Sequence, residues 1–363
     1  MSYAAPGQTS NPFTKNLSDG VGQAAVIHHL STKALLWGRF DVVHVHWPEN
    51  LFRASGTVRN TIKTLCGVVF MLRLELFRTP IVYTKHNLTP HEQPGRLYGA
   101  LYRWVERRVR ATVFLNESSQ NNPAAGVTIL HGDYPPLGGT RRRHPGAEGE
   151  KTILFFGLLR RYKGLETLIG AFTSTADPTL RLRIRGSAVD RQYVSELTSL
   201  ARADPRITFQ PGFLDDPELE RELASADLVV LPYVAIYNSG AALLALSRNR
   251  PILAPDGPST RSLQAEVGES FVRLFGSSLS SEEITAAVDA QDPTPDGTPD
   301  LSRRDWGSIG ALHNRLYELV SSNRRLAPEA LEAAVRRGVA ADRRFVEHSV
   351  RNTLIAGSDD AGI

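Results

Sequence analysis

Short apolar runs alternate with amphipathic helical patterns along almost the whole chain. Strands and helices that alternate in this way are typical of parallel sheets, because each crossover to the next parallel strand needs a helix. The sequence therefore predicts an α/β fold with a parallel sheet in each half. The predicted strands are residues 24–27, 42–46, 81–85, 111–115 and 127–130, and then 152–156, 181–185, 207–210, 228–231, 252–254 and 271–274. The predicted helices are residues 12–19, 57–77, 95–110, 165–173, 191–203, 217–224, 239–247, 281–289 and 305–320.

A stretch without large apolar side chains separates the two halves. Residues 139–150 are rich in glycine and arginine, which is typical of an exposed linker. A chain of 363 residues is long enough for two domains with separate cores. We predict domains at residues 1–138 and 151–321, followed by a helical tail at residues 322–363.

The composition excludes several classes of protein. Hydrophobic residues make up 41% of the chain and charged residues 22%, as in ordinary soluble globular proteins. The single cysteine, Cys66, excludes an intramolecular disulfide and a zinc site made of several cysteines. The longest apolar run, residues 66–72, is too short to span a bilayer, and no secretory signal begins the chain. We therefore expect a cytoplasmic protein.

The stretch FFGLLRRYKGLETLIGAF at residues 155–172 joins an apolar strand to a helix through a basic loop. Gly157 permits a sharp turn, and the helix after Gly164 begins with backbone N–H groups that lack partners within the helix. Arg160 and Lys163 add positive charge there, so the loop is a candidate site for an anion such as a diphosphate. The alternative is an ordinary crossover whose basic side chains are solvated.

A second candidate segment precedes the apolar helix at residues 239–247. Asn238 or Ser239 can cap that helix, and Gly240 lets an anion approach the backbone closely. A plain capped helix is the alternative. Because the basic loop belongs to the same predicted domain, a diphosphate shared by the two segments explains both of them better.

Three segments resemble the nucleotide-sugar half of GT-B glycosyltransferases. They are residues 156–172, 207–233 and 237–255, and they follow the order and spacing of the family. The sequence is similar to family 4 and to bacterial exopolysaccharide enzymes, mannosyltransferases among them. The resemblance extends over residues 23–321 and is strongest at residues 152–255. It implies a GT-B fold, in which two Rossmann-like parallel-sheet domains face a central cleft.

Carried over by position, the resemblance implies a donor site in the second domain. The residues that it assigns to the donor diphosphate are Arg160, Lys163, Asn238, Ser239 and Gly240, and those that it assigns to the nucleoside are Gly186, Ser187, Gly212 and Phe213.

Three positions depart from the family pattern. The arginine usual after the glycine is Leu158 here, so Arg160 has to take its place. The family's Glu-x7-Glu pair falls on Tyr237 and Ala245, neither of which is acidic. Since the second of those carboxylates is thought to bind the donor ribose, ribose recognition is left open, and retention of the anomeric configuration is not implied.

Two segments in the first half resemble the other domain of the family. They are residues 41–49, DVVHVHWPE, and residues 83–92, YTKHNLTPHE. The resemblance places His86, with Asn87 beside it, under the donor sugar at the reaction centre. A histidine that is merely hydrogen-bonded at the end of a strand is the alternative.

Other polar residues of the first half are candidates for cleft lining. His44 and His46 share one face of a strand, which favours a core position for both, although His46 and Glu49 could also line the cleft. His131 and Asp133 match the strand-ending turn that leads to the family's linker, where hinge and cleft-lining roles are expected.

An inverting transfer would need a general base for the acceptor hydroxyl. The candidates are Glu92, Glu49, Asp133 and His86. Glu92 is preferred because it lies in the loop that follows the strand ending at His86.

The sequence favours a reaction without metal or cofactor. No acidic DxD-like motif follows a strand, and His86 and His91 lie in a proline-containing loop without the spacing of metal ligands. Basic residues would neutralise the leaving diphosphate instead.

We predict a metal-independent hexosyltransferase that uses a nucleoside diphosphate sugar, with GDP-mannose as the candidate donor, and a glycan or polyprenyl-linked acceptor. The basic stretches within residues 53–110 suggest contact with the anionic inner face of the plasma membrane, although solvated helix faces explain them equally well. Nucleic acid is not an expected partner. A GT-B sugar phosphorylase or epimerase, and a catalytically degenerate partner subunit, are the alternative functions.

Overall fold

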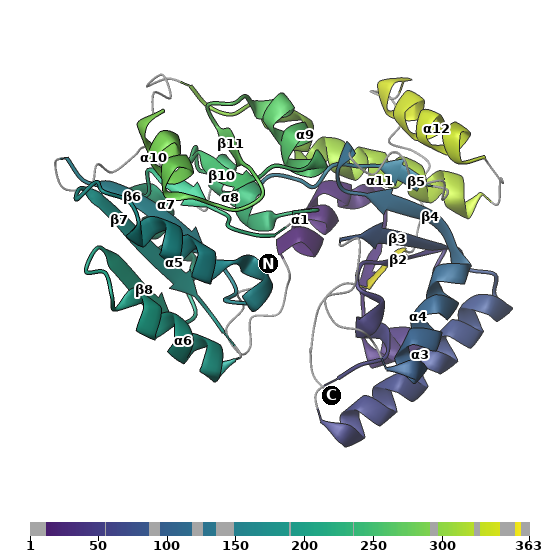
Figure 1. The fold of residues 1–363 in the computed structure, drawn as a ribbon. Helices are drawn as coiled ribbons and strands as arrows, with labels where there is room; N and C mark the ends of the chain where they lie inside the picture. Colours follow the sequence, from purple (N-terminus) through teal and green to yellow (C-terminus); the bar gives the residue numbers. More distant parts are fainter. Residues whose placement is uncertain are drawn as a thin grey trace. The chain divides into compact units, whose positions relative to one another are not determined.

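The computed structural model describes residues 12–54, 56–86, 95–117, 126–135, 149–188, 190–234, 236–290, 297–322, 327–341 and 353–356. These residues form two compact units, each built on its own parallel sheet (Figure 1). The first unit combines residues up to 132 with those from 303 onward, and the second unit is residues 133–302. None of the helices in the described ranges is long and apolar enough to cross a membrane.

The second unit contains six parallel strands in the order β11-β10-β9-β6-β7-β8. The strands are β6 (Lys151–Phe156), β7 (Leu180–Gly186), β8 (Ile207–Pro211), β9 (Leu228–Val230), β10 (Ile252–Pro255) and β11 (Val272–Phe275). The helices are α5 (Leu165–Thr173), α6 (Arg191–Ala201), α7 (Asp216–Ser225), α8 (Gly240–Ser247), α9 (Pro258–Val267) and α10 (Ser281–Asp289), with the 3-10 turn η4 (Arg161–Lys163). Every strand predicted in this half is confirmed, with ends that differ by at most one residue.

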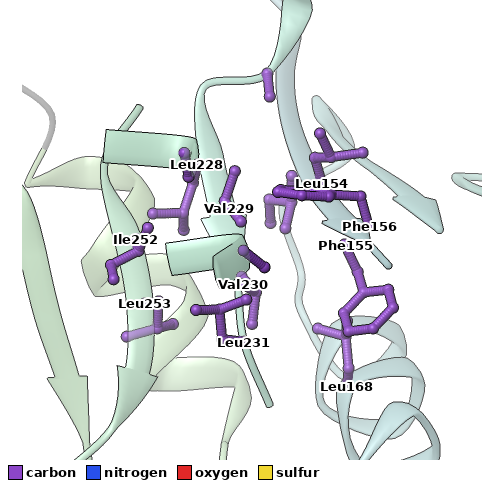
Figure 2. Packing of buried hydrophobic residues seen from close by; sticks show 14 of the residues in the cluster. Leu154, Phe155, Phe156, Leu168, Leu228, Val229, Val230, Leu231, Ile252 and Leu253 are labelled. Carbon is purple, nitrogen blue, oxygen red and sulfur yellow. The ribbon is translucent and has the colours of Figure 1, made fainter. Parts of the chain in front are cut away.

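The central strands of this sheet are buried on both faces because their sequences are continuously apolar. Figure 2 shows Phe155 and Phe156 of β6 in one cluster with Val230 of β9 and Leu253 of β10. Leu168 of α5 belongs to the same cluster, which holds the helix onto the sheet. The loops at the carboxyl ends of the strands are therefore carried by a rigid core.

The first unit also contains six parallel strands, in the order β1-β12-β2-β3-β4-β5. The strands are β1 (Ile27–His29), β2 (Val42–Val45), β3 (Ile81–Lys85), β4 (Val109–Phe114), β5 (Gly126–Thr128) and β12 (Thr353–Ala356). The helices are α1 (Pro12–Val21), α2 (Thr32–Trp37), α3 (Thr57–Leu76), α4 (Arg96–Arg108), α11 (Trp306–Ser321) and α12 (Pro328–Ala341), and η2 (Pro48–Leu51) is a 3-10 turn. The predicted first strand begins later than expected, because residues 22–24 form a 3-10 turn.

The prediction of a purely helical tail at residues 322–363 is wrong. α12 is helical, but β12 is a strand that pairs with β1 on one side and β2 on the other. Backbone N–H and C=O groups of β2 would otherwise lack strand partners on that side, so the end of the chain completes the sheet. The segment is only four residues long, and its partners are more than 300 residues away along the chain.

The prediction that α11 closes the second domain is also wrong. Trp306, Ile309 and Tyr317 of α11 are buried in one cluster with Phe13 and Leu17 of α1. The apolar face of α11 is therefore covered by the other end of the chain, which puts the helix in the first unit. Of the predicted linker, residues 139–148 lie outside the described part of the chain.

Two helices were not predicted, α2 and α9. The sequence of α2 is too short for a clear helical period, although Ser31 caps it by accepting a hydrogen bond from the N–H of Ala34 at 3.1 Å. The sequence of α9 is mostly polar, and it starts with Pro258.

The close approach of α1 to α11 yields a test of the fold. A Cβ atom at Gly310 of α11 would collide with the carbonyl oxygen of Gly20, whereas one at Gly170 of α5 would meet nothing. We predict that Gly310→Ala lowers the free energy of unfolding by about 1–3 kcal/mol, because the two helices must move apart. Gly170→Ala is the matched control and should be neutral or raise it by about 1 kcal/mol. Urea denaturation of both variants measures the difference, and equal effects would contradict this packing.

Candidate active site

Three loops meet at the carboxyl ends of β6, β7 and β8. The N–H of Leu159 donates to the carbonyl of Ser187 at 2.7 Å, and the N–H of Gly212 donates to the carbonyl of Gly186 at 2.8 Å. Gly186 has a positive φ of 146°, and a Cβ atom there would collide with the carbonyl oxygen of Gly157. Only glycine fits this junction, which brings three of the residues predicted for nucleoside binding beside the basic loop.

The fourth residue predicted for nucleoside binding is Phe213, which follows Gly212 after β8. Its ring is 43% exposed, which is unusual for a phenylalanine next to a packed core. An exposed aromatic face at this edge of the sheet can stack on a planar base.

Lys163 is the most distinctive charged residue of the second unit. Only 2% of its surface is exposed, and its Nζ has no hydrogen-bond partner in the described part of the chain. Nζ lies 5.0 Å from the ring centroid of Tyr233 and 5.8 Å from that of Phe155. Burial, assisted by the charge of Arg160, lowers the pKa of Lys163 to about 8. The site thus holds a cation that is enclosed without a counter-ion from the described residues.

Gly164 fixes the position of Lys163. Its φ of 66° lies in the left-handed region, which ends the η4 turn and starts α5 at once. A Cβ atom at Gly164 would collide with the carbonyl oxygen of Pro232, just after β9. The close contact between these two backbones holds Lys163 beside Tyr233.

The two arginines of the basic loop have different roles. Arg161 Nη1 lies 2.7 Å from a carboxylate oxygen of Glu196, and the guanidinium lies over the ring of Tyr193 at 4.7 Å. Arg160 is exposed and forms no ion pair with the described residues. Arg161 therefore holds the loop to α6, and Arg160 is the arginine that can meet a ligand.

Ser239 begins the helix α8, as the sequence predicts. Its Oγ accepts a hydrogen bond from the N–H of Ala242 at 3.2 Å, and Gly240 is the first residue of the helix. The N–H groups of the first turn point toward the start of the helix, where an anion is favoured. Burial raises the pKa of the Tyr233 phenol. Tyr233, whose ring lies beside Lys163 Nζ, belongs to the segment that joins β9 to α8.

Asn238 and Tyr237 are half-buried in the loop before α8. Ala245, at the second position of the missing carboxylate pair, is fully buried inside α8. Neither position carries a carboxylate, and the described residues around them present positive charge and N–H groups.

The first unit brings five histidine rings together: His44 in β2 and His46 directly after it, His86 after β3, His131 after β5 and His313 in α11. His44 Nδ1 lies 2.7 Å from Tyr317 Oη, and His44 Nε2 lies 2.7 Å from Thr84 Oγ1. His44 is thus a core histidine with both nitrogens hydrogen-bonded, as expected. Its ring centroid lies 4.2 Å from that of His46 and 5.5 Å from that of His313.

His46 and His86 form a hydrogen-bonded pair. His46 Nδ1 lies 3.0 Å from His86 Nε2, and the ring of Trp47 stacks on His86 with centroids 4.4 Å apart. His44, His46 and His131 are buried, whereas His86 keeps part of its surface exposed. His86 is therefore the ring of this group that a substrate can reach.

The protonation of the pair follows from the surroundings of His46. Burial lowers the pKa of His46 to about 3. The pKa of His86 is also lowered, first by burial and then by the neighbouring His46 and His131. Both rings are therefore neutral near pH 7. His46 Nε2 is buried and has no hydrogen-bond partner within the described ranges. A buried N–H without an acceptor is rarer than an idle lone pair, so the proton of His46 is favoured on Nδ1. His86 then carries its proton on Nδ1, where it is a hydrogen-bond donor.

The ring of Phe13 of α1 contacts three of the histidine rings. Its ring centroid lies 5.4 Å from His46, 5.0 Å from His86 and 4.9 Å from His131, each in an edge contact. Trp306 of α11 makes another edge contact with Phe13, with centroids 5.3 Å apart. Sequence reasoning missed Phe13, Trp306, His313 and Tyr317, since no local pattern links α1 or α11 to the strands. The one signal in the sequence for this cluster is His313, a histidine among the apolar positions of α11.

The remaining candidates divide into three groups. Glu49 lies half-buried in η2, where burial raises the pKa of its carboxyl and Arg53 opposes that rise. Asp133 is half-buried at the start of the second unit. Asn87 and Glu92 lie outside the described residues. Among the residues that the structure describes, no group of three or more His, Cys, Asp or Glu side chains is arranged to hold a metal ion.

The buried histidines yield a test in mild acid. The folded-state pKa of His313 is lowered by burial to about 4, whereas the unfolded chain titrates near about 6.5. The unfolded chain binds more protons between these values, so the free energy of unfolding falls as the pH drops below about 6.5, by about 2 kcal/mol at about pH 5 for this residue. We predict that His313→Leu makes this pH dependence shallower by that amount, as measured by urea denaturation. His29→Gln, at an exposed position of β1, should keep the wild-type slope; a wild-type slope for His313→Leu would contradict the assignment.

Comparison with known proteins shows what this chain is similar to. The sequence profile of the group 1 glycosyl transferases matches residues 150–287. A GDP-mannose:glycolipid 4-β-D-mannosyltransferase of Xanthomonas campestris is 36% identical over 318 residues, which are 87% of this chain and 90% of the relative. An uncharacterised glycosyltransferase of Methanocaldococcus jannaschii is 33% identical over 246 residues, which are 59% of this chain and 57% of that protein.

Solved structures were found at lower similarity. Anabaena HepE in complex with UDP and glucose has a TM-score of 0.49 and 15% identity, with 91% of this chain and 81% of that chain covered. WaaG, a glycosyltransferase involved in lipopolysaccharide biosynthesis, has a TM-score of 0.47 and 17% identity, with 78% of this chain and 84% of that chain covered.

Proposed function

The chain belongs to the group 1 glycosyltransferases, and we propose that it transfers mannose from GDP-mannose to a lipid-linked saccharide. The mannosyltransferase relative supports this donor and this acceptor class, because the similarity extends over 90% of its length. The two parallel-sheet units agree with the GT-B fold that the sequence predicts.

The observation that carries the proposal is the enclosed ammonium of Lys163. Breaking the bond between the sugar and the nucleotide places negative charge on the leaving diphosphate. Lys163, Arg160 and the N–H groups at Ser239 and Gly240 supply the compensating positive charge in the second unit. Asn238 lies in the same loop and completes the diphosphate site.

The same cations make a metal ion or another cofactor unnecessary in this proposal. A diphosphate leaving group can be stabilised by lysine, arginine and a helix start without a divalent ion. The nucleoside lies along the loops of Gly186, Ser187 and Gly212, where the exposed ring of Phe213 can stack on the guanine.

The residues of the first unit that contact the reacting sugar are His86, Asn87 and Glu92, and those that line the acceptor site are His46, Glu49 and His131. His86 acts as a hydrogen-bond donor through Nδ1, which leaves the role of general base to a carboxylate. The 4-β-D-mannosyltransferase relative supports a β-linked product. Making a β-mannoside from an α-linked donor requires inversion, and hence such a base. Glu92 is the preferred candidate, and Glu49 is the alternative, because burial raises the pKa of its carboxyl toward the range of a base.

The protein works in the cytoplasm at the inner face of the plasma membrane, where lipid-linked saccharides are reached. Its basic stretches within residues 53–110 contact the anionic surface there.

The leaving-group site yields a test of catalysis. We predict that Lys163→Met lowers kcat at least about 100-fold with GDP-mannose and a polyprenyl-linked saccharide, because the charge of the leaving group is no longer matched. Methionine fills the space between Phe155 and Tyr233 and preserves the fold. Lys151→Met removes a cation at the start of β6 that is paired with Asp289, and it should leave kcat within about threefold of wild type. Near-normal kcat for Lys163→Met would rule out this role.

The lowered pKa of Lys163 yields a test of binding. The diphosphate binds the charged ammonium, so affinity for GDP should fall as the pH rises through about 8, where Lys163 loses its proton. Calorimetric titration with GDP from about pH 6.5 to about pH 9.5 measures the trend. Lys163→Met should bind more weakly and lose that dependence, and an unchanged pH profile in this variant would contradict the assignment.

A further inference from the structure

The side chain of Tyr233 carries a buried hydroxyl that forms no hydrogen bond with the described residues. The residue is 7% exposed, and its Oη is buried without a partner in the described part of the chain. Proteins pair nearly all of their buried polar groups, because an unpaired one costs stability. Tyr233 is not among the site residues that the sequence predicts, so its hydroxyl needs another explanation.

The backbone places Tyr233 at the carboxyl edge of the second sheet. Leu231, two residues before it, belongs to the central cluster (Figure 2), and its N–H donates to the carbonyl of Leu253 at 2.8 Å. The carbonyl oxygen of Pro232 lies against Gly164 of the basic loop. Because β9 and β6 are parallel neighbours, Tyr233 lies at the same edge of the sheet as the loop that follows β6.

A second donor without a partner lies beside Tyr233. Lys163 Nζ is 5.0 Å from the centroid of the phenol ring, and it forms no hydrogen bond within the described ranges. An ammonium over the face of a ring interacts with the π electrons of that ring. Lys163 and Tyr233 therefore do not pair with each other through the hydroxyl, and both donors are left for a third group.

The chemistry of the two donors indicates what that group is. Burial raises the pKa of the Tyr233 phenol, so its oxygen keeps the proton near neutral pH. The ammonium of Lys163 is charged below about pH 8. A ligand that satisfies both groups needs several acceptor atoms and negative charge in one small unit. The oxygens of a diphosphate meet both requirements.

We propose that the Tyr233 hydroxyl donates a hydrogen bond to the diphosphate of the sugar donor, beside the ammonium of Lys163. This inference rests on the proposed function, because it adds a residue to the diphosphate site and extends that site to the end of β9. A bond from a neutral hydroxyl to a charged oxygen is stronger than one between neutral groups.

The same hydrogen bond acts during the transfer. The bond between the anomeric carbon and the distal phosphate oxygen breaks, and its electron pair moves to that oxygen. The acceptor oxygen bonds to the anomeric carbon and passes its proton to the general base. Tyr233 keeps its own proton, because its raised pKa makes it a weak acid. Negative charge grows on the diphosphate in this step, so Tyr233 contributes to kcat as well as to donor affinity.

Packing alone is the other role that Tyr233 could have. Its ring covers the ammonium of Lys163, which the ring of phenylalanine would do equally well. Tyr233→Phe separates the two roles, because it keeps the ring and removes only the hydroxyl.

Calorimetric titration of the full-length protein with GDP tests the proposal. We expect Tyr233→Phe to weaken GDP binding about tenfold, which corresponds to one hydrogen bond to a charged group. The kcat of mannosyl transfer should fall at least about tenfold. Tyr102→Phe, which removes a hydroxyl from α4 in the first unit, is the matched control and should bind GDP like wild type.

Thermal unfolding without ligand shows that the variant is folded and what the hydroxyl does in the free protein. A hydroxyl without a partner inside the protein stabilises nothing there, so Tyr233→Phe should match or exceed the wild-type Tm. GDP should raise the Tm of this variant less than that of wild type.

Equal GDP affinity of wild type and Tyr233→Phe would overturn the inference and leave the proposed function intact. A lower Tm of the ligand-free variant would also overturn it, because the hydroxyl would then be bonded within the protein. If wild type binds UDP instead of GDP and the variant weakens that binding, the inference stands and GDP-mannose is rejected as the donor. A wild-type protein that binds no nucleoside diphosphate would reject the proposed function and this inference with it.

Discussion

The enclosed charge of Lys163 is the constraint on which the donor half of this protein depends. An ammonium with 2% exposure and no hydrogen-bond partner among the described residues is costly to bury, and its lowered pKa reflects that cost. Gly164, next to Lys163, packs directly against the backbone after β9, which holds this part of the loop close to the sheet. A diphosphate would offset the cost of burial by supplying the missing negative charge. The proposed diphosphate would therefore bind where the fold already encloses a positive charge.

In the first unit, the surroundings of the buried histidines keep their rings neutral. Burial and mutual repulsion lower the pKa of His44, His46 and His86. Phe13 and α11 enclose these rings from elements that lie far from β2 and β3 in the sequence. In the proposed function, a neutral His86 would contact the sugar without adding positive charge, and a carboxylate would act as the general base.

The sequence correctly predicted the features that depend on interactions between residues close together in the chain. The strands of the second unit, the basic loop, and the helix start at Ser239 were all found because apolar runs, glycines and caps act over a few residues. The errors came from long-range contacts. The short sequence of β12 gains its strand structure only between β1 and β2, and α11 joins the first unit because Phe13 and Leu17 cover its apolar face. Lys163 was singled out by the basic loop pattern and by the resemblance, but its enclosure by Tyr233 and Phe155 required the fold.

The central claim is that this chain moves mannose from GDP-mannose to a lipid-linked saccharide. Product analysis tests it most directly: the protein is incubated with GDP-mannose and a polyprenyl-linked oligosaccharide, and the products are identified by NMR and mass spectrometry. The account predicts equal amounts of GDP and of the acceptor extended by one β-linked mannose, formed without added metal ions. Free mannose, a mannose phosphate that appears only with inorganic phosphate, or GDP-mannose binding without turnover would contradict it.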